Sequence, residues 1–242
     1  MNSSLSTILV LLATIINSIV FGYIASNSKN NKTNQSYLLF LTFIILYTIF
    51  DCIIIQSYES IASKNFIVKI QAFLWMPLPI LFLNFIYLFL RKEKDQLFHL
   101  FSVFTIVSIF FTMFNNNILV GYKGFNLGTM AYTGSWFLFV TFVGILPPAV
   151  YAFYLIGKAS NIFIFWKKST SDISKEILTL QLKLPFFGSV LCFLIAVSTN
   201  IFFDEIFGYS GELHLASLAL SFQSMFLLPA LVKYNFLNQP IE

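Results

Sequence analysis

Polar side chains inside otherwise apolar stretches are the residues of this chain best suited to chemistry. Asp51 is the only acidic residue in such a stretch, and Gln71, Asn200 and Gln223 lie in three others. A polar group in hydrocarbon is unfavourable unless it finds a partner or water. We therefore expect Asp51 to face the interior, beside Gln71 or Asn200. Together with Gln223 these residues would line an outward-open ligand-binding pocket. The alternatives are that they only bond helices to one another, or that they reach the lipid headgroups directly.

The remaining polar residues do not form a pattern typical of catalysis, metal binding or a cofactor. His99 and His214 lie far apart, without the HxxxH or HExxH spacing of zinc sites. The last apolar stretch offers only Lys233, at its end, whereas a retinal Schiff base needs a lysine deep inside the helix. Cys52 and Cys192 fall within apolar stretches, where a small buried thiol is the ordinary role. We predict no enzyme activity, no catalytic residue, no metal site and no cofactor.

Seven apolar stretches separated by short polar loops must position these residues. A helix crosses a hydrocarbon layer of roughly 30 Å with about 20 residues, and barrel strands are shorter and alternate in character. A composition of 58% hydrophobic and 10% charged residues excludes a soluble domain of this size. We predict an all-α fold, a seven-transmembrane helix bundle. The predicted spans are Leu5–Ala25, Tyr37–Gln56, Ile67–Leu90, Leu97–Phe114, Ser135–Gly157, Leu184–Phe203 and Leu213–Val232.

The distribution of basic residues predicts the orientation of the bundle. Short cytoplasmic loops retain Lys and Arg. With the N-terminus outside, the inner segments carry 11 of the 14 basic residues, and the outer segments carry only Lys64, Lys69 and Lys123. We predict a multi-pass protein of the cell inner membrane, with its N-terminus outside and its C-terminus in the cytoplasm. This asymmetry also accounts for the net charge of +4, so no nucleic-acid partner is expected.

Two proline pairs interrupt predicted spans. Pro77 and Pro79 lie in the third span, and Pro147 and Pro148 lie in the fifth. Each proline removes a backbone N–H, frees a carbonyl and bends its helix. The bends predict hinges, or else static kinks of the kind common in membrane helices.

Three stretches of the sequence resemble a known family. The first stretch is residues 200–237, NIFFDEIFGYSGELHLASLALSFQSMFLLPALVKYNFL. It has acidic residues at the end of the sixth span, then a short loop that contains glycine, and basic and aromatic residues at the end of the seventh span. The second stretch, SKEILTLQLKLPFFG, resembles a basic segment that leads into a sixth helix. The third stretch, LPILFLNFIYLFLRKEK, resembles the end of a third helix followed by charged residues. Together they are similar to the seven-transmembrane N-terminal sensory region of bacterial sensor histidine kinases. The resemblance implies a receptor module for an extracytoplasmic or membrane-borne signal, with an unknown small molecule or lipid as ligand.

The resemblance also implies a division of the chain and a set of partners. Residues 1–236 would form the sensory domain in the lipid bilayer, and residues 237–242 a cytoplasmic connector tail. Pro229, Lys233 and Tyr234 would relay movement of the last helix to a cytoplasmic signalling domain or partner, with a homodimer among the expected assemblies. These residues contain no phosphoacceptor or ATP-binding domain, so we expect the kinase output to lie elsewhere. The alternative function is a small seven-helix transporter or channel.

Overall fold

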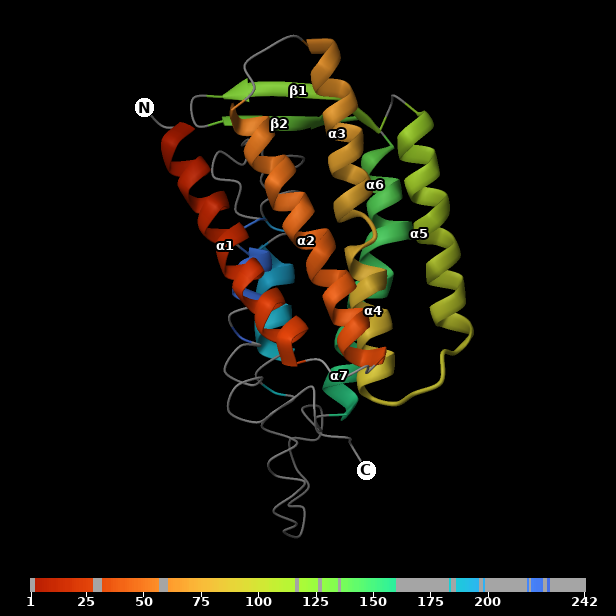
Figure 1. Cartoon of the computed structure of the whole chain (residues 1–242). Helices are drawn as coiled ribbons and strands as arrows, with labels where there is room; N and C mark the ends of the chain where they lie inside the picture. Colours follow the sequence, from red (N-terminus) through yellow and green to blue (C-terminus); the bar gives the residue numbers. More distant parts are fainter. Residues whose placement is uncertain are drawn as a thin grey trace.

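The computed structural model describes residues 3–27, 32–56, 61–115, 118–125, 128–134, 136–159, 183, 186–195, 198, 217, 219–223 and 226. Within these residues, five helical segments are long and apolar enough to cross a membrane, and they lie side by side in one bundle (Figure 1). The first span, Thr7–Ser26, lies in α1 (Ser3–Asn27), and the second, Lys32–Ile53, lies in α2 (Lys32–Gln56). The third, Lys69–Phe89, extends over α3 (Ile61–Trp75) and α4 (Leu78–Phe89), and the fourth is α5 (Gln96–Phe114). The fifth, Phe137–Ala159, consists of α6 (Phe137–Val140), the π-helical turn η1 (Thr141–Ile145) and α7 (Leu146–Ala159).

The sixth and seventh predicted spans are described only in part. Phe186–Ile195 forms a shorter apolar helix inside the sixth. Within the seventh, Ser217, residues 219–223 and Phe226 are helical. The five described spans agree with the predicted helical bundle, whereas the count of seven spans stays a prediction.

A short β-hairpin, which the all-α prediction did not include, lies outside the helical spans. Strands β1 (Leu119–Phe125) and β2 (Gly128–Thr133) pair antiparallel between α5 and α6, with an irregularity in register between Leu119 and Gly121. The hairpin lies at the end of the bundle where α3 begins and α5 ends (Figure 1). Two-stranded hairpins are marginal alone, so the contact with α3 supports this one.

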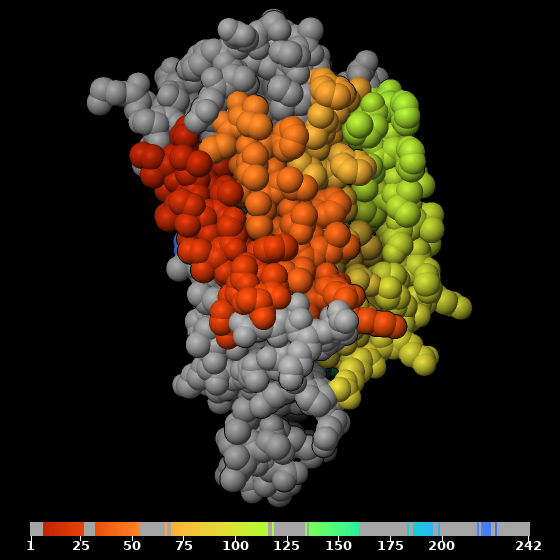
Figure 2. Space-filling model, in the orientation of Figure 1, coloured from red at the N-terminus to blue at the C-terminus, as the bar shows by residue number. Residues whose placement is uncertain are grey.

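The bundle is packed inside and apolar outside. The rings of Tyr37 on α2 and Phe85 on α4 are both buried, with centroids 4.8 Å apart, in the largest cluster of buried side chains. In contrast, Ile19 on α1 and Phe110 on α5 are each 59% exposed. Figure 2 shows α1, α2, α3 and α5 forming one continuous face. A helical face with so many exposed large apolar side chains matches hydrocarbon better than water.

The first proline pair interrupts its span. α3 ends at Trp75, a turn follows at Met76 and Pro77, and α4 begins at Leu78. Pro77 and Pro79 cannot donate the N–H groups that a continuous helix would need. The predicted interruption of the third span is confirmed, and it divides the span one turn beyond Gln71.

The second proline pair follows the π-helical turn η1. In a regular α-helix the Gly144 carbonyl would accept the N–H of residue 148, but Pro148 has none. Thr105 on α5 supplies the replacement, because its hydroxyl donates to the Gly144 carbonyl at 2.9 Å. The span is thus bonded to α5 at the position where its own ladder is broken.

Glycine at position 144 also allows α5 to approach closely. A Cβ built on Gly144 would lie 2.7 Å from the Ser108 Cβ and 2.2 Å from its hydroxyl oxygen. Small residues at helix crossings allow this close packing. Thr105, Ser108 and Thr112 are buried with helical spacing on α5, which identifies the face that packs here.

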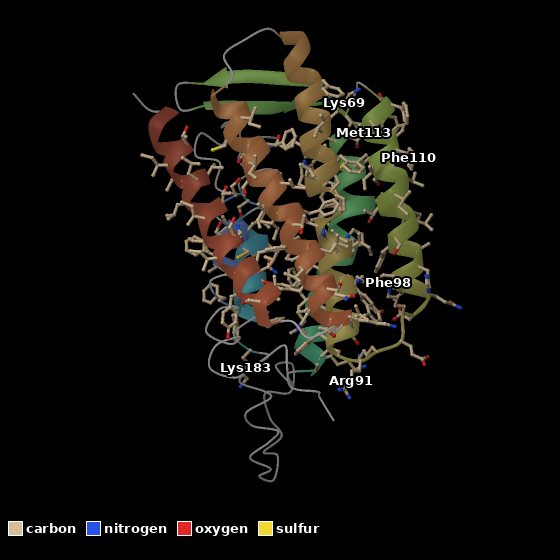
Figure 3. All side chains as sticks on the ribbon, in the orientation of Figure 1. Lys69, Arg91, Phe98, Phe110, Met113 and Lys183 are labelled. Carbon is tan, nitrogen blue, oxygen red and sulfur yellow. The ribbon has the colours of Figure 1, made fainter. Side chains whose placement is uncertain are left out.

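Basic residues gather at the end of the bundle opposite the hairpin. Arg91 and Lys183 lie at this end, and Lys69 lies at the other (Figure 3). Lys69 Nζ donates to the Met113 carbonyl at 3.0 Å, in the last turn of α5. It thereby compensates the negative end of that helix. In the described part of the chain, the basic residues thus lie at the ends of the bundle at which the predicted orientation requires them. Neither end is thereby assigned to a compartment.

We expect Gly144→Ala to lower the free energy of unfolding in detergent by about 1–3 kcal/mol, because the new methyl group overlaps Ser108. Adding Ser108→Gly should recover part of the loss. The matched control is Gly22→Ala on α1, where no atom lies within 4 Å of the added Cβ. There alanine should be neutral or stabilising, by at most about 1 kcal/mol. Equal losses at both glycines would contradict the close approach.

Candidate functional site

One face of α2 carries Asp51 into the bundle. Tyr37, Leu41, Ile44, Thr48 and Asp51 are all buried, at steps of three or four residues. This spacing places them on one side of an α-helix. The face is apolar in its first half and polar at its end, so Asp51 enters the interior with an exposed fraction of only 2%.

The carboxylate of Asp51 joins three parts of the chain. Gln71 Nε2 on α3 donates to Asp51 Oδ1 at 3.1 Å, and the Ser217 hydroxyl donates to Asp51 Oδ2 at 2.5 Å. Ser217 belongs to the C-terminal part of the chain and is fully buried. A buried carboxylate needs such donors because water is not there to solvate it.

Neighbouring polar contacts extend this arrangement to α1. Asn17 on α1 donates to the Ser221 hydroxyl at 3.4 Å, and Thr14 donates to Thr48 on α2 at 2.9 Å. Ser221 in turn donates to the backbone carbonyl of Ser217 at 2.9 Å. We call the residues Asn17, Asp51, Gln71, Ser217 and Ser221 the Asp51 network. It connects α1, α2 and α3 with the segment around Ser217.

The inward direction predicted for Asp51 and its pairing with Gln71 are confirmed. Gln223 is buried, but its side-chain nitrogen donates to the Ser189 hydroxyl at 3.1 Å instead. Asn200 lies outside the described residues. The proposed relay residues Pro229, Lys233 and Tyr234 also lie outside them, as does the tail 237–242. Ligand binding by the four predicted residues stays a prediction.

Sequence reasoning missed the hydroxyl donors of this network. Ser217 and Ser221 are four residues apart, the spacing that puts two side chains on one helix face. Serine gives little signal in an apolar stretch, because its hydroxyl can bond to its own helix backbone and it changes the mean hydropathy little. Helical spacing of the serines, read together with Asp51, is the signal that could have found them.

The network consists of hydrogen bonds that a ligand could exchange. Among the described residues no cluster of three His, Cys, Asp or Glu side chains could hold a metal ion. Both oxygens of Asp51 accept bonds from neutral donors. A ligand that carries its own N–H or O–H groups could therefore compete with Gln71 or Ser217 for the carboxylate.

A second carboxylate, Asp95, organises the opposite end of the bundle. Its Oδ1 accepts the backbone N–H of Phe98 at 2.9 Å and so caps α5, while the Tyr151 hydroxyl donates to its Oδ2 at 2.7 Å. Desolvation by its neighbours raises the pKa of the Asp95 carboxyl, but the nearby Tyr87 hydroxyl and the hydrogen bonds from Tyr151 and the Phe98 N–H outweigh it. The net effect holds this pKa below its ordinary value.

No protein-family model, no curated protein and no solved structure matches the chain.

Replacing Asp51 tests the network. Asp51→Ala removes the acceptor of Gln71 and Ser217, and each stranded buried group should lower the free energy of unfolding by about 1–3 kcal/mol. Asp51→Asn keeps the shape and one acceptor oxygen, so its loss should be clearly smaller. Thermal unfolding of the purified variants in neutral detergent measures both. Identical losses for the two substitutions would argue against the observed bonds.

Replacing Asp95 tests the second carboxylate through pH. Because its pKa is lowered in the folded state, its stabilisation is present above pH about 4 and is lost as pH falls through the folded pKa. Asn still caps α5 but cannot accept from Tyr151 through its NH₂ group. Asp95→Asn should therefore lower the melting temperature at pH 7 and flatten its fall in acid. Asp95→Ala should cost about 1 kcal/mol more, through loss of the cap. Parallel pH curves for wild type and Asp95→Asn would contradict the assignment.

Proposed function

We propose that the chain is a membrane sensor module, which detects an extracytoplasmic or membrane-borne signal and passes it to a cytoplasmic signalling output. The observation that carries the proposal is the position of Asp51. One buried carboxylate is bonded both to Gln71 on α3 and to Ser217 in the C-terminal part of the chain. A change at this carboxylate therefore acts directly on the segment that leads towards the output.

The signalling step is an exchange of hydrogen-bond donors on Asp51. A ligand, or a change in helix packing, that takes the place of the Ser217 hydroxyl releases the segment around Ser217 from α2. Since unpaired polar groups are costly in an apolar interior, the bonded and released arrangements are discrete states. A ligand with different affinity for the two states shifts their populations. The shift would reach the cytoplasm through Pro229, Lys233 and Tyr234.

The proposal includes a topology and a location. Arg91, Lys92, Lys94 and Lys158 are exposed at the end opposite the hairpin. Basic loops favour the cytoplasmic side, so this end would face the cytoplasm of the inner membrane and the N-terminus would be outside. The expected partners are bilayer lipid, a small-molecule or lipid ligand, and a cytoplasmic signalling domain, with a second copy forming a homodimer.

Reporter fusions test this topology. Green fluorescent protein fused after Glu242 should fluoresce, and alkaline phosphatase at the same position should be inactive, because the first folds in the cytoplasm and the second in the periplasm. A fusion inserted between residues 126 and 127, which link β1 to β2 in the sequence, should give the reverse pair of results. Phosphatase activity after Glu242 without fluorescence would overturn the proposed orientation.

A small transporter or channel is the second candidate. The break between α3 and α4 begins at Met76, shortly after Gln71 in the same span. Interrupted helices beside buried polar groups are typical of transporter binding sites. Transport would use the Asp51 network as a substrate site instead of a signalling contact.

A chimera and a flux assay separate the candidates. With the catalytic part of a dimeric sensor kinase fused after Glu242, Ser217→Ala and Asp51→Asn should change the level of autophosphorylation. Ser102→Ala is the matched control, because its hydroxyl bonds the Phe98 carbonyl of its own helix. The 242-residue chain in liposomes should neither transport solutes nor catalyse a reaction. Solute flux that Asp51→Asn abolishes, or chimera output indifferent to both substitutions, would reject the sensor.

A further inference from the structure

Two lysines at the basic end of the bundle each lie beside an aromatic ring. Lys94 Nζ lies 4.5 Å from the centre of the Phe98 ring, and Lys158 Nζ lies 5.9 Å from that of Tyr154. Tyr151 stacks on Tyr154, with ring centres 5.9 Å apart. We call Lys94, Phe98, Tyr151, Tyr154 and Lys158 the aromatic–basic patch. It is formed by the turn before α5, the start of α5 and the end of α7.

The patch is fixed in place by bonds to the turn before α5. Tyr151 donates to Asp95, which also caps α5, so the ends of α5 and α7 are held together. Phe101 contacts Tyr151 edge to face, with ring centres 5.7 Å apart. The turn that follows α4 also has a fixed backbone conformation. Arg91 adopts the left-handed conformation with φ 51°, and the Lys92 N–H donates to the Tyr87 carbonyl at 3.0 Å.

Positive charge dominates this surface. Arg91, Lys92, Lys94 and Lys158 are exposed here, and the acidic residues of the turn are Glu93 and Asp95. Both carboxylate oxygens of Asp95 already accept hydrogen bonds. The surface is therefore complementary to an anion.

Apolar surface continues directly from the charged groups. Leu97 and Leu100 on α5 are 42% and 45% exposed, and Tyr154 on α7 is 47% exposed. Val103 and Val107, further along α5, are exposed by more than half. An occupant of the whole surface must therefore present a negative group followed by a long apolar part. A soluble anion fits only the first half of this description.

We propose that the aromatic–basic patch binds the headgroup of an anionic phospholipid, whose acyl chains lie along the exposed apolar face of α5. Lys94 and Lys158 attract the phosphate, and Tyr154 offers a hydroxyl at the level of the headgroup. The proposal concerns which lipid is preferred at one place on the surface. It is independent of the sensor function and of which end faces the cytoplasm.

Thermal unfolding in the presence of added lipid tests the proposal. The purified chain in neutral detergent is titrated with phosphatidylglycerol or with phosphatidylcholine of the same acyl chains. Phosphatidylglycerol should raise the melting temperature more, because a ligand that binds only the folded state stabilises it. Glycerol 3-phosphate, which lacks acyl chains, should have little effect. Equal shifts with the two lipids, or a full shift with glycerol 3-phosphate, would overturn the proposal.

Substitutions locate the binding surface. The pair Lys94→Gln and Lys158→Gln should lose most of the phosphatidylglycerol-dependent shift, and the pair Lys94→Arg and Lys158→Arg should keep it. Lys32→Gln is the matched control, because Lys32 is exposed on α2 outside the patch. An equal loss in the control would reduce the effect to general charge and contradict a defined site.

A salt titration of the unmodified chain keeps the test independent of variant folding. The phosphatidylglycerol-dependent shift should shrink as sodium chloride rises from about 0.05 to 0.5 M, because exposed charges are screened over shorter distances. A shift unaffected by salt would contradict recognition of the headgroup by the lysines.

Discussion

The structure depends on one constraint: polar groups inside an apolar bundle must be bonded within the protein. Asp51 meets this constraint through Gln71 and Ser217, and the Gly144 carbonyl meets it through Thr105. Each of these bonds crosses from one span to another or to the C-terminal part of the chain. The helix arrangement is therefore specified by a few polar contacts, while the apolar side chains supply the close packing around them.

The same contacts link structure to the proposed function. What distinguishes the Asp51 network is the separation of its members along the chain, since Asp51 and Ser217 are 166 residues apart. Such a contact gives an early helix direct influence over the last part of the chain.

Hydropathy made the spans predictable, and it also limited what could be predicted beyond them. Asp51 could be placed inside because an acidic residue in an apolar stretch must find a partner in the interior. The prolines marked the interrupted spans because they lack the backbone N–H of a regular helix. Ser217 could not be found, because serine is nearly neutral on hydropathy scales and bonds equally well to its own helix. The hairpin was missed because short strands that contain glycines resemble a loop in the sequence. The bond from Thr105 to the Gly144 carbonyl joins residues 39 positions apart in the sequence, so no local pattern predicts it.

The bond from Thr105 to Gly144 has a consequence for the biogenesis of the protein. Alone in hydrocarbon, the span Phe137–Ala159 would lose the Thr105 donor at the carbonyl to which Pro148 can offer no N–H, and polar groups left unpaired there are costly. The group that relieves this cost lies on α5, which is synthesised immediately before it. The two spans are therefore best inserted as a pair, joined by the hairpin, so that the second enters the bilayer against a surface already prepared for it.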